Sequence, residues 1–155
     1  MKPPLGTKHP LCLPPQIAFI TLVIGSLLHA LSPTSWRIIP ALPALGIVLL
    51  SIGAILAVWA LAIFRSQRTP VYPTTTPTRL VTSGPFKFTR NPMYLGIAFI
   101  LVALVFLLGS LPMFVAPVLF LLVMNLYYLP FEETKMEKLF GETYSSYRQR
   151  VRRWL

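Results

Sequence analysis

The chain has 155 residues, of which 55% are hydrophobic and only 12% are charged, about half the roughly 25% found in ordinary soluble domains. These proportions exclude a typical water-soluble globule and predict one domain whose solvent is lipid. The net charge of +10 comes from 14 Lys and Arg against 4 acidic residues. This charge is segregated along the chain, which argues against a nucleic-acid-binding surface. The single Cys12 excludes an internal disulfide bond and a metal site built from several cysteines.

Long stretches without charged residues predict membrane spans, because a helix crosses the roughly 30 Å hydrocarbon layer with about 20 apolar residues. Two of these stretches are long enough for one helix each. The third, residues 91–131, is long enough for two helices, and Gly109 and Ser110 interrupt it near the middle. The sequence therefore predicts four spans, at about 16–31, 43–64, 92–108 and 113–129.

The basic residues indicate how these spans are oriented. Four spans place both chain termini and the loop 65–91 on the same side of the membrane. Thirteen of the 14 basic residues fall on that side, and only Arg37 falls on the other. By the positive-inside rule, that side is cytoplasmic. The sequence thus predicts one all-α integral membrane domain over residues 1–155, with a cytoplasmic loop at 65–91 and a cytoplasmic helical tail at 131–155.

The tail carries apolar side chains at helical spacing with Lys, Arg and Glu between them, which is typical of an amphipathic helix on a membrane surface. Glu132 precedes Met136 by four residues and so projects from the apolar stripe. A carboxylate there needs a cation, either on a bound ligand or on an arginine of the loop. The position of Glu133 is compatible with a side of the tail helix that is exposed to water. The stripe consists of Met136, Phe140, Tyr144, Tyr147, Val151 and Trp154.

A polar row leads from the fourth span toward this carboxylate, since Asn125, Tyr128 and Glu132 are spaced three and four residues apart. If the helix continues past Pro130, the row either holds helices together or lines a path for an amphiphilic substrate. His29 in the first span favours a structural hydrogen bond, although an ionisable residue within a span is also a functional candidate.

The loop ends with the sequence LVTSGPFKFTRNPMYLG, from Leu80 to Gly96. Its Gly-Pro pair predicts a turn, and Asn91 before Pro92 predicts the start of the third span, because proline fits the first turn of a helix. The free N–H groups of this helix start, with Arg90 beside them, could hold an anionic or polar group. They could equally be a capped helix end with a snorkelling arginine.

This segment is followed, after a helical hairpin, by EETKMEKLFGETYSSYRQRVRRWL. Together the two segments resemble the isoprenylcysteine carboxyl methyltransferase and phospholipid methyltransferase family of integral membrane enzymes. The resemblance covers about residues 80–155 and the layout of the spans. It implies a membrane-embedded methyltransferase that binds S-adenosylmethionine between the loop, the start of the next helix and the Glu-Glu tail. The methyl group would pass to a lipophilic acceptor that enters from the bilayer.

The resemblance also implies which residues form the cofactor site. Glu132 would contact the cofactor, with Glu133 beside it, and Arg90 would support the pocket. Glu132 and Tyr128 are the catalytic candidates, and Asn125 and Tyr128 are the candidates for contact with the acceptor. The predicted cofactor-binding set is Leu80, Val81, Gly84, Arg90, Asn91, Pro92, Tyr94, Gly96, Glu132 and Glu133.

Two departures from the family pattern bear on the reaction. Asn91 stands where the family most often has a histidine, which disfavours a mechanism with that histidine as base. Tyr128 stands where prenylcysteine methyltransferases carry an arginine suited to a substrate carboxylate, and a tyrosine supplies no charge. A carboxylate or thiol acceptor needs no strong base, whereas a lipid amine must lose a proton to Glu132, Glu133 or Tyr128.

Two other functions are compatible with the sequence. Some membrane sterol reductases resemble this family in the same C-terminal region and use NADPH, but the chain has no G-x-G-x-x-G fingerprint for a Rossmann site. A non-catalytic membrane protein would instead dock its basic loop and tail on anionic lipid or on a partner, with no dependence on a cofactor.

Overall fold

The computed structural model describes residues 13–33, 42–69 and 77–155, and within these ranges the regular structure is entirely helical. Predictions that concern Lys2, Lys8, Cys12, Arg37 or residues 70–76 of the loop lie outside the described residues. The main helices are α1 (Pro14–Leu31), α2 (Pro43–Ser66), α3 (Pro92–Leu108), α4 (Val115–Val123) and α5 (Leu129–Arg150). Shorter turns are the 3₁₀ helices η2 (Gly84–Lys87) and η3 (Pro112–Phe114) and the π-helical turn η4 (Met124–Tyr128).

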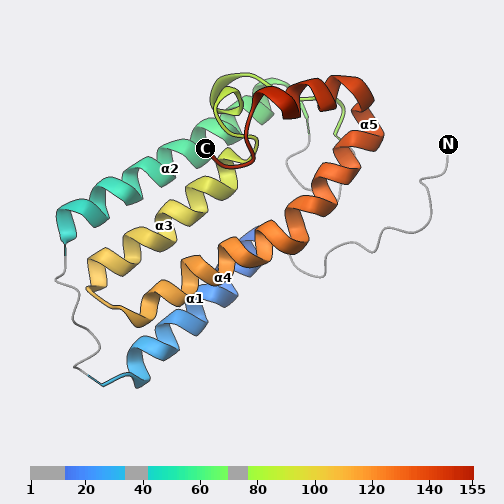
Figure 1. Ribbon diagram of the computed structural model, residues 1–155. Coiled ribbons are helices and arrows are strands. Elements are labelled where there is room, and N and C mark those ends of the chain that lie inside the picture. Colours follow the sequence, from blue (N-terminus) through green and yellow to red (C-terminus); the bar gives the residue numbers. More distant parts are fainter. Residues whose placement is uncertain (1–12, 34–41, 70–76) are drawn as a thin grey trace.

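The long helices have the length and composition of membrane spans. By these criteria α1, α2 and the continuous run Pro112–Arg150 can each cross a membrane, and α3 is a shorter apolar helix of 17 residues. Large apolar side chains such as Phe19 and Val58 are each 66% exposed on the outside of α1 and α2, where lipid tails would cover them. Figure 1 shows the long segments running side by side. The predicted all-α membrane fold is confirmed, and α1, α2 and α3 begin and end within two residues of the expected bounds.

Small residues bring α2 and α3 into close contact along their length. A Cβ atom added at Gly53 would lie 2.6 Å from the carbonyl oxygen of Gly96, and one added at Gly96 would lie 2.7 Å from the carbonyl oxygen of Gly53. The two backbones therefore touch, as is common where membrane helices associate through glycine and alanine. On the other side of the bundle, α1 packs along α4.

A tight turn joins α3 to η3 and α4, as the sequence predicts. Gly109 ends α3 in the left-handed region with φ of +58°, a conformation that glycine adopts without strain. The hydroxyl of Ser110, which follows it, lies 2.7 Å from Nδ1 of His29 near the end of α1. His29 thus has the structural hydrogen bond expected for it.

The helix after this turn continues farther than its apolar stretch. The π-helical turn η4 follows α4 directly, and the N–H of Leu129 donates to the carbonyl of Met124, five residues back. Pro130, which has no N–H to donate, comes just after this wide turn, and the helix runs on into α5. We place the residues from Pro130 onward outside the apolar span, because Glu132 and Glu133 begin the charged part of the chain.

The tail differs from the expected helix over 131–155 in two ways. Gly141 has φ of +51° and ψ of −127°, so α5 changes direction there, and the helix ends at Arg150. Val151 is extended, yet its side chain is buried with Tyr144 and Tyr147 against protein rather than lying on a membrane surface. Figure 1 shows the end of α5 crossing over the ends of α2 and α3. This crossing closes one end of the bundle and builds the pocket described next.

Candidate active site

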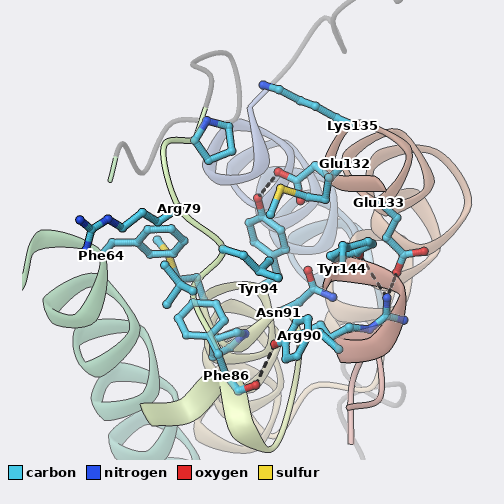
Figure 2. Close-up of a pocket in the computed structure, with 17 residues that line it drawn as sticks. Phe64, Arg79, Phe86, Arg90, Asn91, Tyr94, Glu132, Glu133, Lys135 and Tyr144 are labelled. Carbon is cyan, nitrogen blue, oxygen red and sulfur yellow. Dashed lines mark hydrogen bonds and ion pairs between the residues drawn. The ribbon is translucent and has the colours of Figure 1, made fainter. Parts of the chain in front are cut away.

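The pocket lies where the loop end, the start of α3 and α5 meet, and Figure 2 shows its side chains. Eight of the ten residues predicted to bind a cofactor line it, which are Leu80, Val81, Arg90, Asn91, Pro92, Tyr94, Glu132 and Glu133. The other lining residues are Phe64, Pro77, Arg79, Phe86, Met93, Lys135, Met136, Tyr144 and Tyr147.

The apolar wall of the pocket comes from the loop and the end of α2. The short helix η2 places Phe86 in a buried cluster with Val81 and Ala60. The Phe86 ring packs edge-to-face on Phe64, with 5.3 Å between the ring centroids. This wall can receive a flat apolar or aromatic group.

Glu133 is the most strongly paired acid of the site. Its carboxylate is buried, and its Oε1 lies 3.0 Å from Nη1 of Arg90. Arg153 adds two further hydrogen bonds, from Nε at 2.9 Å and from Nη2 at 2.7 Å. Burial would raise the pKa of Glu133, but the hydrogen bonds from Arg153 and the charges of both arginines hold it below its ordinary value. The expectation of a solvated face for Glu133 is therefore wrong.

Glu132 lies in a different environment, although it is the adjacent residue. Its side chain is partly buried, and its Oε1 accepts a hydrogen bond of 2.9 Å from the hydroxyl of Tyr94 (Figure 2). Burial raises the pKa of Glu132 to about 7, an effect that the Tyr94 hydrogen bond and the charge of Lys135 partly offset. Within the described ranges no ion pair is formed by Glu132. The loop arginine that could have paired with it is engaged by Glu133 instead.

The start of α3 is attached to the end of the chain. The side-chain amide of Asn91 donates to the carbonyl of Arg153 at 2.9 Å, so it binds the tail and does not cap its own helix. The Thr89 hydroxyl donates to the same carbonyl at 3.2 Å. The backbone N–H of Arg90 donates to the carbonyl of Arg152 at 3.0 Å. Asn91 and Arg90 therefore line the pocket and are also fixed to the tail.

Tyr128 lies behind Tyr94, one layer of side chains farther from the pocket. It is 2% exposed, and its ring packs edge-to-face on the Tyr94 ring, with 6.1 Å between the centroids. The Tyr128 hydroxyl has no hydrogen-bond partner in the described part of the chain. Tyr128 does not line the pocket itself, but it backs the tyrosine that contacts Glu132.

The structure separates Asn125 from the row predicted for it. Asn125 is exposed and accepts a hydrogen bond of 2.8 Å from Nη1 of Arg153, which also holds Glu133. The reason is the π-helical turn η4, which contains Asn125 and widens the helix before Glu132. Asn125 instead lines a second, apolar groove on α2, α3 and α4, together with Leu49, Leu95, Ala98, Phe99, Val102, Leu121, Leu122 and Trp154.

Gly84 and Gly96, also predicted for the cofactor site, do not line the pocket. Gly84 has φ of +60° and begins η2, which sets the course of the loop against α2. Gly96 forms the contact between α2 and α3 described above. Both glycines lie in the packing of their segments against α2.

Sequence reasoning missed the two tyrosines of α5 as site residues. The Tyr147 hydroxyl donates to the carbonyl of Phe86 at 2.7 Å, and the Tyr144 hydroxyl accepts from Nη1 of Arg90 at 3.2 Å. Their signal was the apolar stripe of the tail, which includes Met136 as well. The sequence predicts a membrane contact for the stripe, whereas Met136, Tyr144 and Tyr147 of the stripe line the pocket.

Comparison with known proteins shows the family to which the chain belongs. A sequence model of the family described as phospholipid methyltransferase matches residues 42–143, well over half of the chain. A protein of Haemophilus influenzae, described only as uncharacterized, is 41% identical over 63 residues, which are 41% of this chain and the whole of that relative. No solved structure matches significantly. The family match includes α2, the loop, the start of α3 and both glutamates of α5, and the chain belongs to the phospholipid methyltransferase family.

Proposed function

We propose that the protein is a membrane-embedded methyltransferase that uses S-adenosylmethionine and methylates a lipophilic acceptor. Membership of the phospholipid methyltransferase family supports a membrane methyltransferase. The observation that carries the cofactor assignment is the Glu132 carboxylate, which faces the pocket without an ion pair among the described residues while Glu133 is held by two arginines.

The residues of the pocket fit S-adenosylmethionine chemically. Glu132 offers a carboxylate to the cationic ammonium and sulfonium end of the cofactor. The wall of Val81, Phe64 and Phe86 suits the flat adenine ring. Arg79, exposed at the rim, offers a cation to the carboxylate of the cofactor.

Bound S-adenosylmethionine supplies an electrophilic methyl group on a sulfonium. The protein's own contribution is mainly to align the acceptor and to keep water out, because methyl transfer is an in-line displacement that neutralises charge. For an amine acceptor, Glu132 is the first general-base candidate, because its carboxylate faces the pocket. The buried hydroxyl of Tyr128, which lacks a partner in the described structure, is the second catalytic candidate.

The acceptor is proposed to be a carboxylate, thiol or amine attached to a long apolar chain. The groove on α2, α3 and α4 is lined almost entirely by apolar side chains. Asn125 and Trp154 are the lining residues whose side chains carry polar atoms. Such a groove on membrane helices suits an acyl or isoprenoid chain. Asn125 therefore stays a candidate for acceptor contact, at a place separate from Glu132.

Isothermal titration calorimetry on the purified protein in detergent tests the proposal. S-adenosylmethionine should bind the unaltered protein, and Glu132→Ala should weaken binding roughly tenfold or more, as expected for loss of a charge-assisted contact. Glu137→Ala is the matched control, because that acid lies on the exposed side of the same helix, where it pairs with Arg148 at 3.7 Å and accepts a hydrogen bond from Ser145 at 3.4 Å. NADPH should not bind.

Size-exclusion profiles and melting curves would establish that both variants remain folded. Failure of the unaltered protein to bind S-adenosylmethionine would refute the function. Equal affinity of the unaltered protein and Glu132→Ala would remove Glu132 from the site but leave the function standing.

A further inference from the structure

The last residues of the chain connect three elements around the pocket. After α5 ends at Arg150, the backbone carbonyls of Arg152 and Arg153 accept hydrogen bonds from the segment that precedes α3, as described above. The indole of Trp154 packs against the buried cluster of α3 and α4. The segment 151–154, which we call the tail clasp, therefore lies across the back of the pocket.

The side chain of Arg153 carries this connection beyond the backbone. Its Nε and Nη2 bind the two oxygens of Glu133 in a bidentate pair, and its Nη1 donates to Oδ1 of Asn125 at 2.8 Å. A guanidinium can hold both partners at once because its donors form a fixed planar fork. Arg153 thus bridges the pocket and the π-helical turn η4, which lines the membrane-facing groove.

Glu133 in turn determines where Arg90 lies. Arg90 lines the pocket, and its Nη1 contacts both the Glu133 carboxylate and the Tyr144 hydroxyl. Without Arg153, the buried carboxylate of Glu133 would keep one cationic partner of the two. An incompletely compensated buried charge draws in water or shifts its remaining partner, which here is part of the pocket wall.

We propose that Arg153 is a positioning residue for the cofactor pocket, acting through Glu133 and Arg90, and that the pocket binds its ligand well only when the tail clasp is seated. The inference rests on the proposed function, since the ligand is taken to be S-adenosylmethionine. Binding and seating are then thermodynamically linked, so each favours the other.

Calorimetry with S-adenosylmethionine as the probe tests this linkage. Arg153→Met should weaken binding roughly tenfold, in the range measured for coupled sites. Arg150→Met is the matched control, because it removes the same charge from an exposed side chain that, among the described residues, donates to the carbonyl of Ser146 in its own helix. Its affinity should stay within about twofold of the unaltered protein, as for surface changes generally.

A double-mutant cycle separates positioning from a merely structural role. If Arg153 acts through Glu133, the loss caused by Arg153→Met should shrink to about threefold or less in the Glu133→Gln background, because coupled residues are not additive. If Arg153 only stabilises the fold, the loss should be the same in both backgrounds, and that result would overturn the proposal.

Milder variants keep the test decisive if Arg153→Met does not fold. Arg153→Lys keeps the charge but loses the planar fork, and Asn125→Leu removes the outer partner of the guanidinium. Each should weaken binding by roughly threefold, a fraction of the full coupling. Unchanged affinity in both would overturn the inference alone, whereas absence of binding by the unaltered protein would overturn the proposed function as well.

Discussion

Glu132 and Glu133 are neighbours in the chain, but successive residues of a helix point about 100° apart. This rotation places Glu133 between Arg90 and Arg153 and places Glu132 beside Tyr94. One carboxylate is therefore compensated within the protein, whereas the other faces the pocket with its pKa raised by burial. The pair combines a structural anchor with a pocket-facing carboxylate in two adjacent residues.

The raised pKa of Glu132 should make the proposed binding of S-adenosylmethionine depend on pH. Only the ionised carboxylate attracts a cation, and with a pKa of about 7 it is largely protonated below pH 6. The affinity for S-adenosylmethionine should therefore rise between pH 6 and pH 8 and level off above that range, with release of about half a proton on binding at pH 7. Calorimetry in two buffers of different ionisation enthalpy measures this release.

Glu133 should not contribute to this pH dependence, because its lowered pKa keeps it ionised throughout the range. The Glu137→Gln variant should keep the pH dependence of the unaltered protein, since Glu137 lies away from the pocket. An affinity that stays flat from pH 6 to pH 8, with no proton released, would contradict the assigned role of Glu132.

The sequence could single out Glu132 but not the surroundings of Glu133. Glu132 breaks a local apolar stripe, and local spacing is readable from the chain alone. The partners of Glu133 are Arg90 and Arg153, which are brought to it by the folding of the loop and the tail. Contacts of this kind leave no periodic signal, and neither does the bond between Asn91 and the tail carbonyl.

At the scale of whole helices, hydropathy predicts the bounds of α1, α2 and α3 to within two residues. Proline at or near the first turn of α2 and α3 marked where they begin, and Gly109 marked the turn after α3. The course of α5 was not predictable in the same way, because an apolar stripe shows that a face is covered but not by what. Here Tyr144, Tyr147 and Val151 of the stripe pack in one cluster with Leu80 of the loop.

The contact between α2 and α3 should be intolerant of an added methyl group. Gly96→Ala would bring a Cβ atom to 2.7 Å from the carbonyl oxygen of Gly53, and neither backbone can move aside as a side chain would. We expect a loss of about 1–3 kcal/mol in the free energy of unfolding, as is usual for overpacking. A lowered melting temperature in detergent, together with weaker binding of S-adenosylmethionine, would show this loss of stability.

Ser51→Ala is the control for this substitution, because Ser51 lies on the exposed side of α2 and bonds only within that helix. Its melting temperature should be close to that of the unaltered protein. If Gly96→Ala melted at the same temperature as this control, the close approach of the two helices would be in doubt.

At the scale of the molecule, the pocket and the basic segments lie at one end of the bundle. The loop and α5, which carry most of the basic residues, surround the pocket, and the turn between α3 and α4 lies at the other end (Figure 1). The positive-inside rule therefore predicts that the pocket faces the cytoplasm. A soluble cofactor and a membrane-borne acceptor would then approach from different sides of the same site.

Cysteine labelling in intact cells tests this orientation. In a Cys12→Ser background, a membrane-impermeant maleimide should label Leu111→Cys, in the turn between α3 and η3, without permeabilisation of the membrane that holds the protein. Arg150→Cys, at the end of α5, should react only after permeabilisation. The reverse labelling pattern would show that the topology is inverted. Labelling of both sites in intact cells would exclude the predicted topology.

The π-helical turn η4 sets the rotational phase of everything that follows it. One residue corresponds to about 100° of rotation in a helix, so the same chain with a regular α-helical turn at 124–128 would present α5 with a different side toward the pocket. The glutamates would then no longer meet Tyr94 and Arg90. Contact with lipid alone does not fix the rotation of an apolar helix about its axis. The π-helical turn thus fixes which side of α5 faces the pocket. Insertions or deletions of single residues should consequently be tolerated far less between Met124 and Glu132 than their membrane-boundary position would suggest.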